Sequence, residues 1–384
     1  MFLLSDYRYT LPEELIAQEA VRPHHDARMI VIDKIKGEIK DESSFWNIDE
    51  YLGTDRVLFF NDSRVLASRV QLNNIEYTNG GNTGIIQDGE IFYLETKNQN
   101  TFGALVRPGN KFKIGAIFHI GEYSIEVLEM TDSGRLLGIT GGSIESFLET
   151  HGALPLPPYI EYNKEKEKDY QTSFAKNNGS VAAPTASLHF TSELMEKIKN
   201  PKEYLTLHVG LGTFQGIKTT DVRDYAIHRE NVSISIDIFD KIADIKASNK
   251  KIVAVGTTAT RTLESLPYLW KKLDGEYKKG FNANTCKYWN NLTESVQDQD
   301  WIHSIEVNLE LGTLNFETSI YITPGYIFQI IDDLVTNFHL GESSLLVLVS
   351  AFIGYEKTMK IYDYAVKNRY RFYSFGDGMY IRGK

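Results

Sequence analysis

Cysteine, long apolar runs and positive charge are scarce in this 384-residue sequence, and each scarcity excludes a class of protein. The one cysteine, Cys286, excludes a disulfide framework and any zinc or iron–sulfur site built on cysteines. The longest apolar run, residues 345–353, is interrupted by Ser350 and is too short to span a membrane. The N-terminus lacks the basic region and the apolar length of a signal peptide. We therefore expect a soluble cytoplasmic protein.

The net charge of −10 argues against indiscriminate binding of nucleic acid, which needs a broadly basic surface. A local basic face remains compatible with this charge. Basic residues cluster at two places, Arg107, Lys111 and Lys113 in the first half and Lys367, Arg369 and Arg371 near the C-terminus. With 42% hydrophobic residues, the chain is of ordinary globular composition, and its length favours two domains.

The pattern of short apolar runs changes along the chain. Six runs with β-strand chemistry are separated by Gly, Asn and Asp turns, at 69–72, 90–95, 101–106, 116–120, 124–130 and 135–140. Such spacing predicts a small barrel or sandwich. The expected fold is therefore an α/β main domain (1–65 and 146–384) with an inserted all-β, barrel-like domain (66–145). Residues 271–316 show little periodicity and are expected to form a peripheral insertion.

Start and stop signals predict the elements of the α/β part. Strands are expected at 28–33, 204–209, 251–255 and 371–375. Helices are expected from a capping box at Thr10-Leu-Pro-Glu13 through about Glu19, and at 193–199, 238–248, 345–352 and 355–368.

Residues 179–191 contain no formally charged side chain, although the whole chain is 24% charged. Their small residues let the backbone approach either packed protein or a ligand. His189 precedes a helix expected to be capped by Thr191 or Ser192, and the free N–H groups there suit an anion. On its own, the stretch favours a packed segment with a hydrogen-bonded histidine.

Two strand ends carry polar or glycine-rich segments. Asn61, Asp62 and Arg64 follow a buried strand and form either a functional constellation or a satisfied turn. Residues 210–216 are a near miss of the dinucleotide fingerprint, with one residue too many before the last glycine and no helix pattern afterwards. We reject a dinucleotide site there. The run, with Gly210 and Gly212, instead indicates close approach of backbone to a ligand.

The clearest local signal is Val255-Gly-Thr-Thr258, where a buried strand passes into a helix. Thr257, Thr258 and the free N–H groups are placed where an anionic group would bind. Arg261, one turn further, is suited to pair with a carboxylate. The alternative is an ordinary helix start with an exposed arginine.

Many separate segments, in the same order, resemble the S-adenosylmethionine:tRNA ribosyltransferase-isomerase family of queuosine biosynthesis. They cover essentially the whole chain and include Phe60-Asn-Asp-Ser-Arg-Val65, Pro155-Leu-Pro-Pro-Tyr-Ile160, residues 179–191, His208-Val-Gly-Leu-Gly-Thr-Phe214, Val255-Gly-Thr-Thr258, Thr323-Pro-Gly-Tyr326, Thr336-Asn-Phe-His-Leu340 and Tyr370-Arg-Phe372. Departures are local: Ser63, Ser187 and Gly341 stand where Thr, Gly and Pro are usual, and Glu161 and Asp169 where arginines are usual.

The resemblance implies an enzyme that transfers and isomerises the ribosyl moiety of S-adenosylmethionine, its co-substrate, onto a modified tRNA. The acceptor is 7-aminomethyl-7-deazaguanine at the wobble position, and the products are epoxyqueuosine-tRNA, adenine and methionine. The resemblance also implies an α/β domain with an inserted β-barrel and no metal. We expect a monomer.

This chemistry needs proton carriers, because a proton leaves C5′ beside the sulfonium and adenine must be protonated to depart. The candidates are His189, His208, His228 and His339, with Asp62. For the co-substrate they are Thr257, Thr258 and Arg261, with Gly210 and Gly212. For tRNA they are Arg64, Arg369 and Arg371, with Tyr370 and Phe372 as stacking partners for a base. The alternative is that alternation along residues 369–373 buries both rings and sends the arginines to solvent.

Two rival functions are open on residue chemistry. Four histidines with Asp62 and Glu230 suggest a metallohydrolase, although no pair has a ligand spacing such as H-x-x-x-H. A barrel-containing, non-catalytic RNA-binding protein is the second. Metal analysis tests the first, and adenine release from S-adenosylmethionine in the presence of modified tRNA tests the second.

Overall fold

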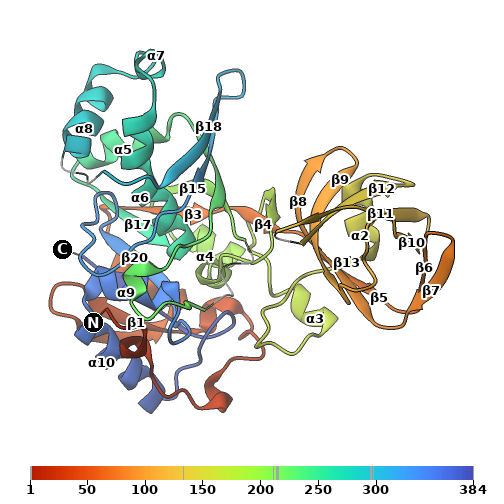
Figure 1. Cartoon of the computed structure of the whole chain (residues 1–384). Helices are drawn as coiled ribbons and strands as arrows, with labels where there is room; N and C mark the ends of the chain where they lie inside the picture. Colours follow the sequence, from red (N-terminus) through yellow and green to blue (C-terminus); the bar gives the residue numbers. More distant parts are fainter. Residues whose placement is uncertain are drawn as a thin grey trace.

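The computed structural model describes residues 2–132, 134–210, 212, 216–294, 296 and 298–383. Figure 1 shows a large lobe, which contains both chain ends, and a smaller, mainly β lobe beside it. Each lobe is built on one large sheet, so the protein is a mixed α/β structure. Within the described residues, no helix combines the length and the apolar character needed to cross a bilayer.

The large lobe is organised by a ten-stranded sheet in the order β18-β19-β16-β15-β3-β17-β20-β21-β1-β2. The strands are β1 (Arg28–Asp33), β2 (Glu38–Ser44), β3 (Arg56–Asn61), β15 (Lys202–His208), β16 (Glu230–Ser235), β17 (Lys251–Val255), β18 (Ile302–Asn308), β19 (Thr313–Thr318), β20 (Asp333–Asn337) and β21 (Gly378–Arg382). The four central strands, β15, β3, β17 and β20, run parallel. Parallel strands are covered on both faces, and every residue of β3 and β20 is buried accordingly.

Helices and short 3-10 turns cover the two faces of this sheet. The helices outside the smaller lobe are α1 (Ile48–Leu52), α3 (Lys164–Glu167), α4 (Ser192–Lys197), α5 (Ile238–Ala247), α6 (Thr257–Lys272), α7 (Gly275–Lys278), α8 (Ala283–Glu294), α9 (Ser344–Ile353) and α10 (Tyr355–Lys367). Of these, α3 and α7 bury no residue. Because successive side chains of a strand point to opposite faces, β3 supplies two cores. Phe59 packs in the core beneath α6, and Phe60 packs with Phe190 on the other face.

The smaller lobe is a nine-stranded sheet in which all neighbouring strands are antiparallel, in the order β13-β5-β8-β9-β12-β11-β10-β6-β7. Its strands are β5 (Arg69–Leu72), β6 (Ile75–Asn79), β7 (Asn82–Ile86), β8 (Gly89–Asn98), β9 (Thr101–Arg107), β10 (Ile117–Ile120), β11 (Tyr123–Thr131), β12 (Gly134–Thr140) and β13 (Gly152–Ala153). Helix α2 (Ile144–His151) adds Phe147 to a separate apolar core around Phe102 and Phe118. Between the lobes, β4 (Ser63–Val65) pairs with β14 (Asn177–Ser180).

Most of the predicted elements are confirmed, and two are wrong. Each of the six strands predicted between 69 and 140 is present, whereas β6 and β7 were missed. The helix predicted from Thr10 is only the 3-10 turn Glu13–Leu15, because Ile16 leaves the turn to bridge Phe372. The strand predicted at 371–375 is absent as well. Phe372 makes only the isolated bridge to Ile16, and the next strand, β21, begins at Gly378.

Residues 271–316 carry more structure than their weak periodicity predicts. They form α7 and α8 and supply β18 and most of β19, so they extend one edge of the large sheet. Trp289 is fully buried, and its indole N–H donates to the carbonyl oxygen of Phe239 at 2.9 Å. This burial ties the segment to the main core at one edge of the sheet.

Candidate functional site

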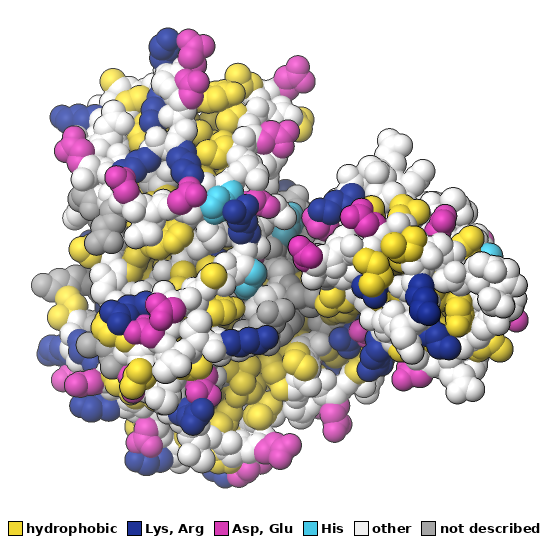
Figure 2. Space-filling view, in the orientation of Figure 1, with side chains coloured by type: hydrophobic (Ala, Val, Ile, Leu, Met, Phe, Trp, Pro, Cys, Tyr) yellow, Lys and Arg dark blue, Asp and Glu magenta, His cyan; other side chains and the backbone are white. Residues whose placement is uncertain are grey.

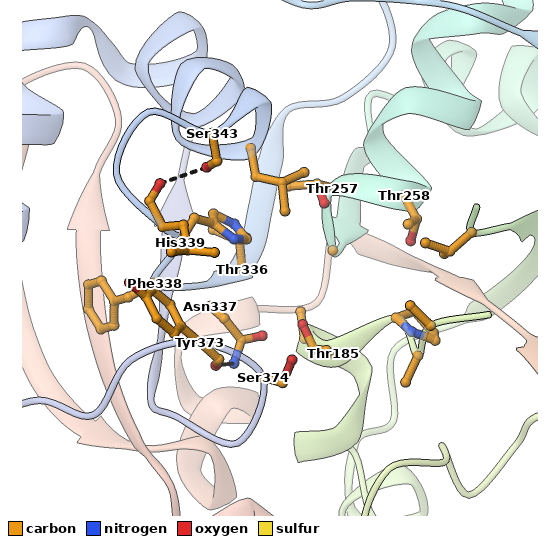
Figure 3. A pocket seen from close by; sticks show the side chains of 18 of the residues that line it. Thr185, Thr257, Thr258, Thr336, Asn337, Phe338, His339, Ser343, Tyr373 and Ser374 are labelled. Atoms are coloured by element: carbon orange, nitrogen blue, oxygen red, sulfur yellow. Dashed lines mark hydrogen bonds between the residues drawn. The ribbon is translucent and has the colours of Figure 1, made fainter. Parts of the chain in front are cut away.

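A cavity opens where the central strands β17 and β20 end (Figure 3). Ligands of open parallel sheets bind at such carboxyl ends. Three segments supply most of its wall, 182–186, 256–258 and 336–340, and Tyr159, Tyr170, Val209, Ser343, Leu345, Tyr373 and Ser374 complete it. No formally charged residue lines it in the part of the chain that the structure describes.

The start of α6 forms one side of this cavity. Gly256, at φ 91°, turns the chain from β17 into the helix, and no side chain caps the helix start. Thr257 and Thr258 line the cavity, and the Thr258 hydroxyl is buried without a hydrogen-bond partner among the described residues. The first turn of a 16-residue helix therefore offers free N–H groups and a hydroxyl to an oxygen-rich or anionic group.

The end of β20 forms the opposite side. Nε2 of His339 contacts the Thr336 hydroxyl at 2.7 Å, and the backbone N–H of His339 donates to the Tyr362 hydroxyl at 3.0 Å. Burial lowers the pKa of His339 to about 3, so the imidazole is neutral. The side chain is thus held in the wall as a neutral group, in contact with a hydroxyl that also lines the cavity.

His189 lies one layer behind this wall. Its ring stacks on Phe45 with centroids 3.9 Å apart, and its Nε2 is 3.2 Å from the amide nitrogen of Asn337. Burial lowers the pKa of His189 to about 3. The cavity is lined by Asn337 and not by His189, so this histidine reaches the cavity only through Asn337.

Arg261, predicted to hold a carboxylate, pairs with a carboxylate of the protein itself. It is 5% exposed, forms an ion pair with Glu230, and donates through Nε to the carbonyl oxygen of Ile320 at 3.2 Å. The backbone N–H of Gly210, at 3.4 Å, and Nε2 of His228, at 3.3 Å, also contact Glu230. Burial raises the pKa of Glu230, but Arg261 and His228 together hold it below its ordinary value. This buried group lies outside the cavity wall.

The residues after β3 form a satisfied turn. Oδ1 of Asp62 accepts from the Thr206 hydroxyl at 2.6 Å and from the Asn177 amide at 3.2 Å. The side chain of Asn61 bonds both backbone groups of Leu207, at 2.9 and 3.0 Å. These bonds tie β3 to β15, and neither residue lines the cavity.

His208 and Gly212 also lie away from the cavity wall. Burial lowers the pKa of His208, although Asp62 acts in the opposite direction. Gly212 packs against the ring of His228, where an added Cβ would lie 2.1 Å from Nδ1. Of the glycine-rich run at 210–216, residues 211 and 213–215 lie outside the described residues.

Gly179→Ala is expected to lower the free energy of unfolding by about 1–3 kcal/mol. Gly179 has φ 146°, and a Cβ there would lie 2.6 Å from Nδ1 of His208. Urea unfolding measures the change, with Gly275→Ala as the control, because nothing lies within 4 Å of a Cβ at that position. Equal unfolding midpoints of both variants and the wild type would contradict the close packing of Gly179 on His208.

The three candidate tRNA contacts lie at the surface in different settings. Arg64 is exposed and forms no ion pair with another described residue. Arg369 is exposed and 3.7 Å from Glu14, whereas Arg371 donates to the carbonyl oxygen of Glu19 at 3.2 Å. The face in Figure 2 mixes basic and acidic side chains rather than forming one broad basic field.

Tyr370 and Phe372 are not available for stacking on a base. Both are fully buried, and Phe372 packs on Phe338 with ring centroids 5.0 Å apart. Tyr370 instead carries the guanidinium of Arg28 over its ring at 3.5 Å. The stacking predicted at these two positions is therefore wrong, because alternation along the chain turns both rings into the core.

The cavity also contains residues to which the sequence assigned no role. Asn337, Thr336, Ser343 and Tyr373 line it. The signal was present in the polar segment 336–344 between a strand and an apolar helix. Among the described residues, no three His, Cys, Asp or Glu side chains lie together as a metal-binding group.

Comparison with known proteins gives consistent matches over the whole chain. A family model described as "Queuosine biosynthesis protein" matches residues 4–381. Proteins named S-adenosylmethionine:tRNA ribosyltransferase-isomerase from Clostridioides difficile, Fusobacterium nucleatum and Halothermothrix orenii are each 37% identical to this chain. Each match covers 98% of this chain and 99%, 96% and 99%, respectively, of the relative. The crystal structure of an S-adenosylmethionine tRNA ribosyltransferase from Thermotoga maritima is 28% identical, with a TM-score of 0.49, over 98% of this chain and 99% of that chain.

Proposed function

This chain belongs to the queuosine biosynthesis protein family, and on that premise we propose that it is an S-adenosylmethionine:tRNA ribosyltransferase-isomerase. It transfers and isomerises the ribosyl moiety of S-adenosylmethionine onto 7-aminomethyl-7-deazaguanine of tRNA, releasing adenine and methionine. The observation that carries the proposal is the uncharged cavity at the ends of β17 and β20. Its apolar lining suits a nucleoside, and the start of α6 suits a carboxylate.

The binding roles follow from the two sides of the cavity. The adenosine moiety occupies the part lined by residues 182–186 and 336–340. The methionine carboxylate meets the N–H groups of α6 with Thr257 and Thr258, which act as hydrogen-bond donors. Arg261 supports this wall from behind through its ion pair with Glu230, together with Gly210, rather than touching the carboxylate.

His339 is our candidate for moving a proton at the ribose. Of the four candidate histidines it is the one that lines the cavity among the described residues, and its Nε2 contacts a hydroxyl of the same wall. The Thr336 hydroxyl, 2.7 Å from its Nε2, provides a path for that proton. His189 positions Asn337, and His208, His228 and Asp62 take structural roles outside the wall.

The nine-stranded sheet is proposed to be an inserted domain. Its support is a core of its own, since the cluster around Phe102 and Phe118 shares no member with the cores of the large lobe. The chain leaves the large lobe after β4 and re-enters it at β14, beside the departing strand. The inserted unit therefore includes α2 and β13 and extends to Ala153.

Charge reversal of Arg64 and Arg369 is expected to weaken tRNA binding and to leave the affinity for S-adenosylmethionine unchanged. Each lost phosphate contact should reduce the slope of log K against log salt by about 0.7–0.9. Reversal of Arg107, which lies 3.8 Å from Asp88 on the smaller lobe, is the matched comparison. If tRNA affinity falls only in the Arg107 variant, the basic face lies on the β lobe.

Adenine release tests the function itself. The wild-type protein, S-adenosylmethionine and tRNA carrying 7-aminomethyl-7-deazaguanine should yield adenine and methionine in proportion to the modified tRNA. The same tRNA with guanine at the wobble position should yield neither product. Absence of release with the modified tRNA, or equal release with both, would overturn the proposed reaction.

A further inference from the structure

Asn337 presents an unused hydrogen-bond acceptor to the cavity. The residue is 1% exposed, and its Oδ1 is buried without a hydrogen-bond partner in the described part of the chain. In Figure 3 this oxygen points into the cavity, toward the side that carries Thr185. A buried acceptor left unpaired costs about 1–3 kcal/mol, so the site is built to receive a donor from a ligand.

The amide group is held in this orientation by its other end. Nδ2 of Asn337 faces three acceptors, the carbonyl oxygens of Tyr373 at 3.2 Å and Asp377 at 3.5 Å and Nε2 of His189 at 3.2 Å. An amide oxygen in place of the nitrogen would meet lone pairs at all three. The NH₂ group therefore faces the protein, and Oδ1 faces the cavity.

The tautomer of His189 is fixed by the same reasoning. Nδ1 lies 3.4 Å from the carbonyl oxygen of His24, which can only accept, so Nδ1 carries the proton. Nε2 is then an acceptor for Asn337. Burial, which lowers the pKa of His189 to about 3, and stacking on Phe45 keep the ring neutral and immobile.

The surroundings of Oδ1 indicate a neutral donor. The described residues that line the cavity include no carboxylate, so an ammonium group there would lack a counter-charge. Tyr373 and Pro184, which line the same cavity, provide apolar surface. A flat, uncharged ring with an exocyclic amino group meets both conditions.

We infer that Oδ1 of Asn337 accepts a hydrogen bond from the 6-amino group of the adenine ring of S-adenosylmethionine, and that His189 is the positioning residue for this contact. The inference rests on the proposed function for the identity of the co-substrate. It adds a determinant of specificity, because a purine without a 6-amino group leaves the buried acceptor unpaired. Sites that use such an acceptor discriminate strongly against ligands without the donor.

Binding to the unaltered protein tests the inference first. Calorimetry compares S-adenosylmethionine with its analogue that carries hydrogen at C6 in place of the amino group, both without tRNA. The expected result is binding roughly tenfold or more weaker for the analogue. Equal affinities would overturn the inference, and no variant that fails to fold can confuse this result.

Variants then assign the discrimination to Asn337. Asn337→Ala should bring the affinity ratio of the two ligands close to one, whereas Ser374→Ala, in the same wall, should retain the wild-type ratio. Oγ of Ser374 is already bonded to the Tyr159 hydroxyl at 2.7 Å, so its loss removes no free acceptor. A ratio unchanged by Asn337→Ala would assign the discrimination elsewhere and overturn the inference.

The role of His189 has its own readout. His189→Leu should lower the affinity ratio, and His189→Gln, whose side-chain oxygen can accept from Asn337, should restore part of it. A purely structural role would change affinity for both ligands alike. The same ratio in both variants as in the wild type would remove His189 from the inference.

A third ligand separates the two amino groups of S-adenosylmethionine. An analogue without the α-amino group should lose the same affinity in the wild type and in Asn337→Ala. If removing the α-amino group cost affinity in the wild type but not in Asn337→Ala, Asn337 would bind that group, and the assignment to adenine would be overturned. All these binding measurements omit tRNA, so they do not depend on the reaction. If the protein preferred ligands with the 6-amino group but released no adenine, the proposed reaction would be rejected and the adenine site would be retained.

Discussion

Glu230→Ala is expected to lower the free energy of unfolding by about 3–5 kcal/mol, the cost of leaving a buried charge without its partner. Arg261 is 5% exposed and would keep its charge, because a guanidinium does not lose its proton in proteins. Its Nη2 already has no hydrogen-bond partner among the described residues, so no other group is in place to compensate. Chemical denaturation followed by circular dichroism measures the loss.

A surface ion pair provides the control for this experiment. Asp363 and Lys367 form an exposed pair at 2.5 Å, and Asp363→Ala is expected to change stability by less than about 1 kcal/mol. Replacing Glu230 and Arg261 together by apolar residues should be less destabilising than replacing Glu230 alone, since no unpaired charge remains. Equal losses for Glu230→Ala and Asp363→Ala would contradict a buried structural ion pair.

Acidification from pH 7 to pH 5 is expected to cost about 2 kcal/mol of stability for each of His189 and His339. Burial lowers the pKa of each to about 3 in the folded protein, against about 6.5 in the unfolded chain. Between these values the unfolded chain binds the proton and the folded protein does not. Stability is therefore full above pH 6.5 and is lost progressively as the pH falls toward 3.

Comparison of variants isolates the histidines from the carboxylates that also titrate in acid. His339→Gln should lose less stability than the wild type between pH 7 and pH 5. His119→Gln, on the exposed surface of the β lobe, should follow the wild type. Identical pH profiles for all three proteins would show that His339 is not held neutral by burial.

The sequence predicted the frame of the site because its signals there are local. A buried strand that passes through glycine into hydroxyl-bearing residues predicts the start of α6, and Gly256, Thr257 and Thr258 all line the cavity. The strands of the β lobe were predicted in the same way, from turns and alternation. β6 and β7 were missed because their exposed polar residues carry little alternation. They are stabilised by strand pairing, β6 with β10 and β7 with β6.

The partners within the site could not be predicted, because they come from distant parts of the chain. From the sequence alone, Arg261 is a good candidate to bind the carboxylate of a ligand. In the fold, the pairing of β15 with β16 brings Glu230 beside it, and Arg261 pairs with that carboxylate instead. His189 and Asn337 are 148 positions apart and meet only because the turn Thr185–His189 packs beside β20. The helix predicted at Thr10 failed for a similar reason, since Ile16 pairs with Phe372.

Hydrogen–deuterium exchange of the wild-type protein with and without S-adenosylmethionine tests most directly whether this cavity is the co-substrate site. The ligand should slow exchange in peptides that contain residues 182–186, 256–260 and 336–345, and should leave the apolar cleft around Phe281 and Leu309 unchanged. Protection confined to that second cleft, or no protection at saturating ligand, would contradict the assignment of the cavity at the ends of β17 and β20.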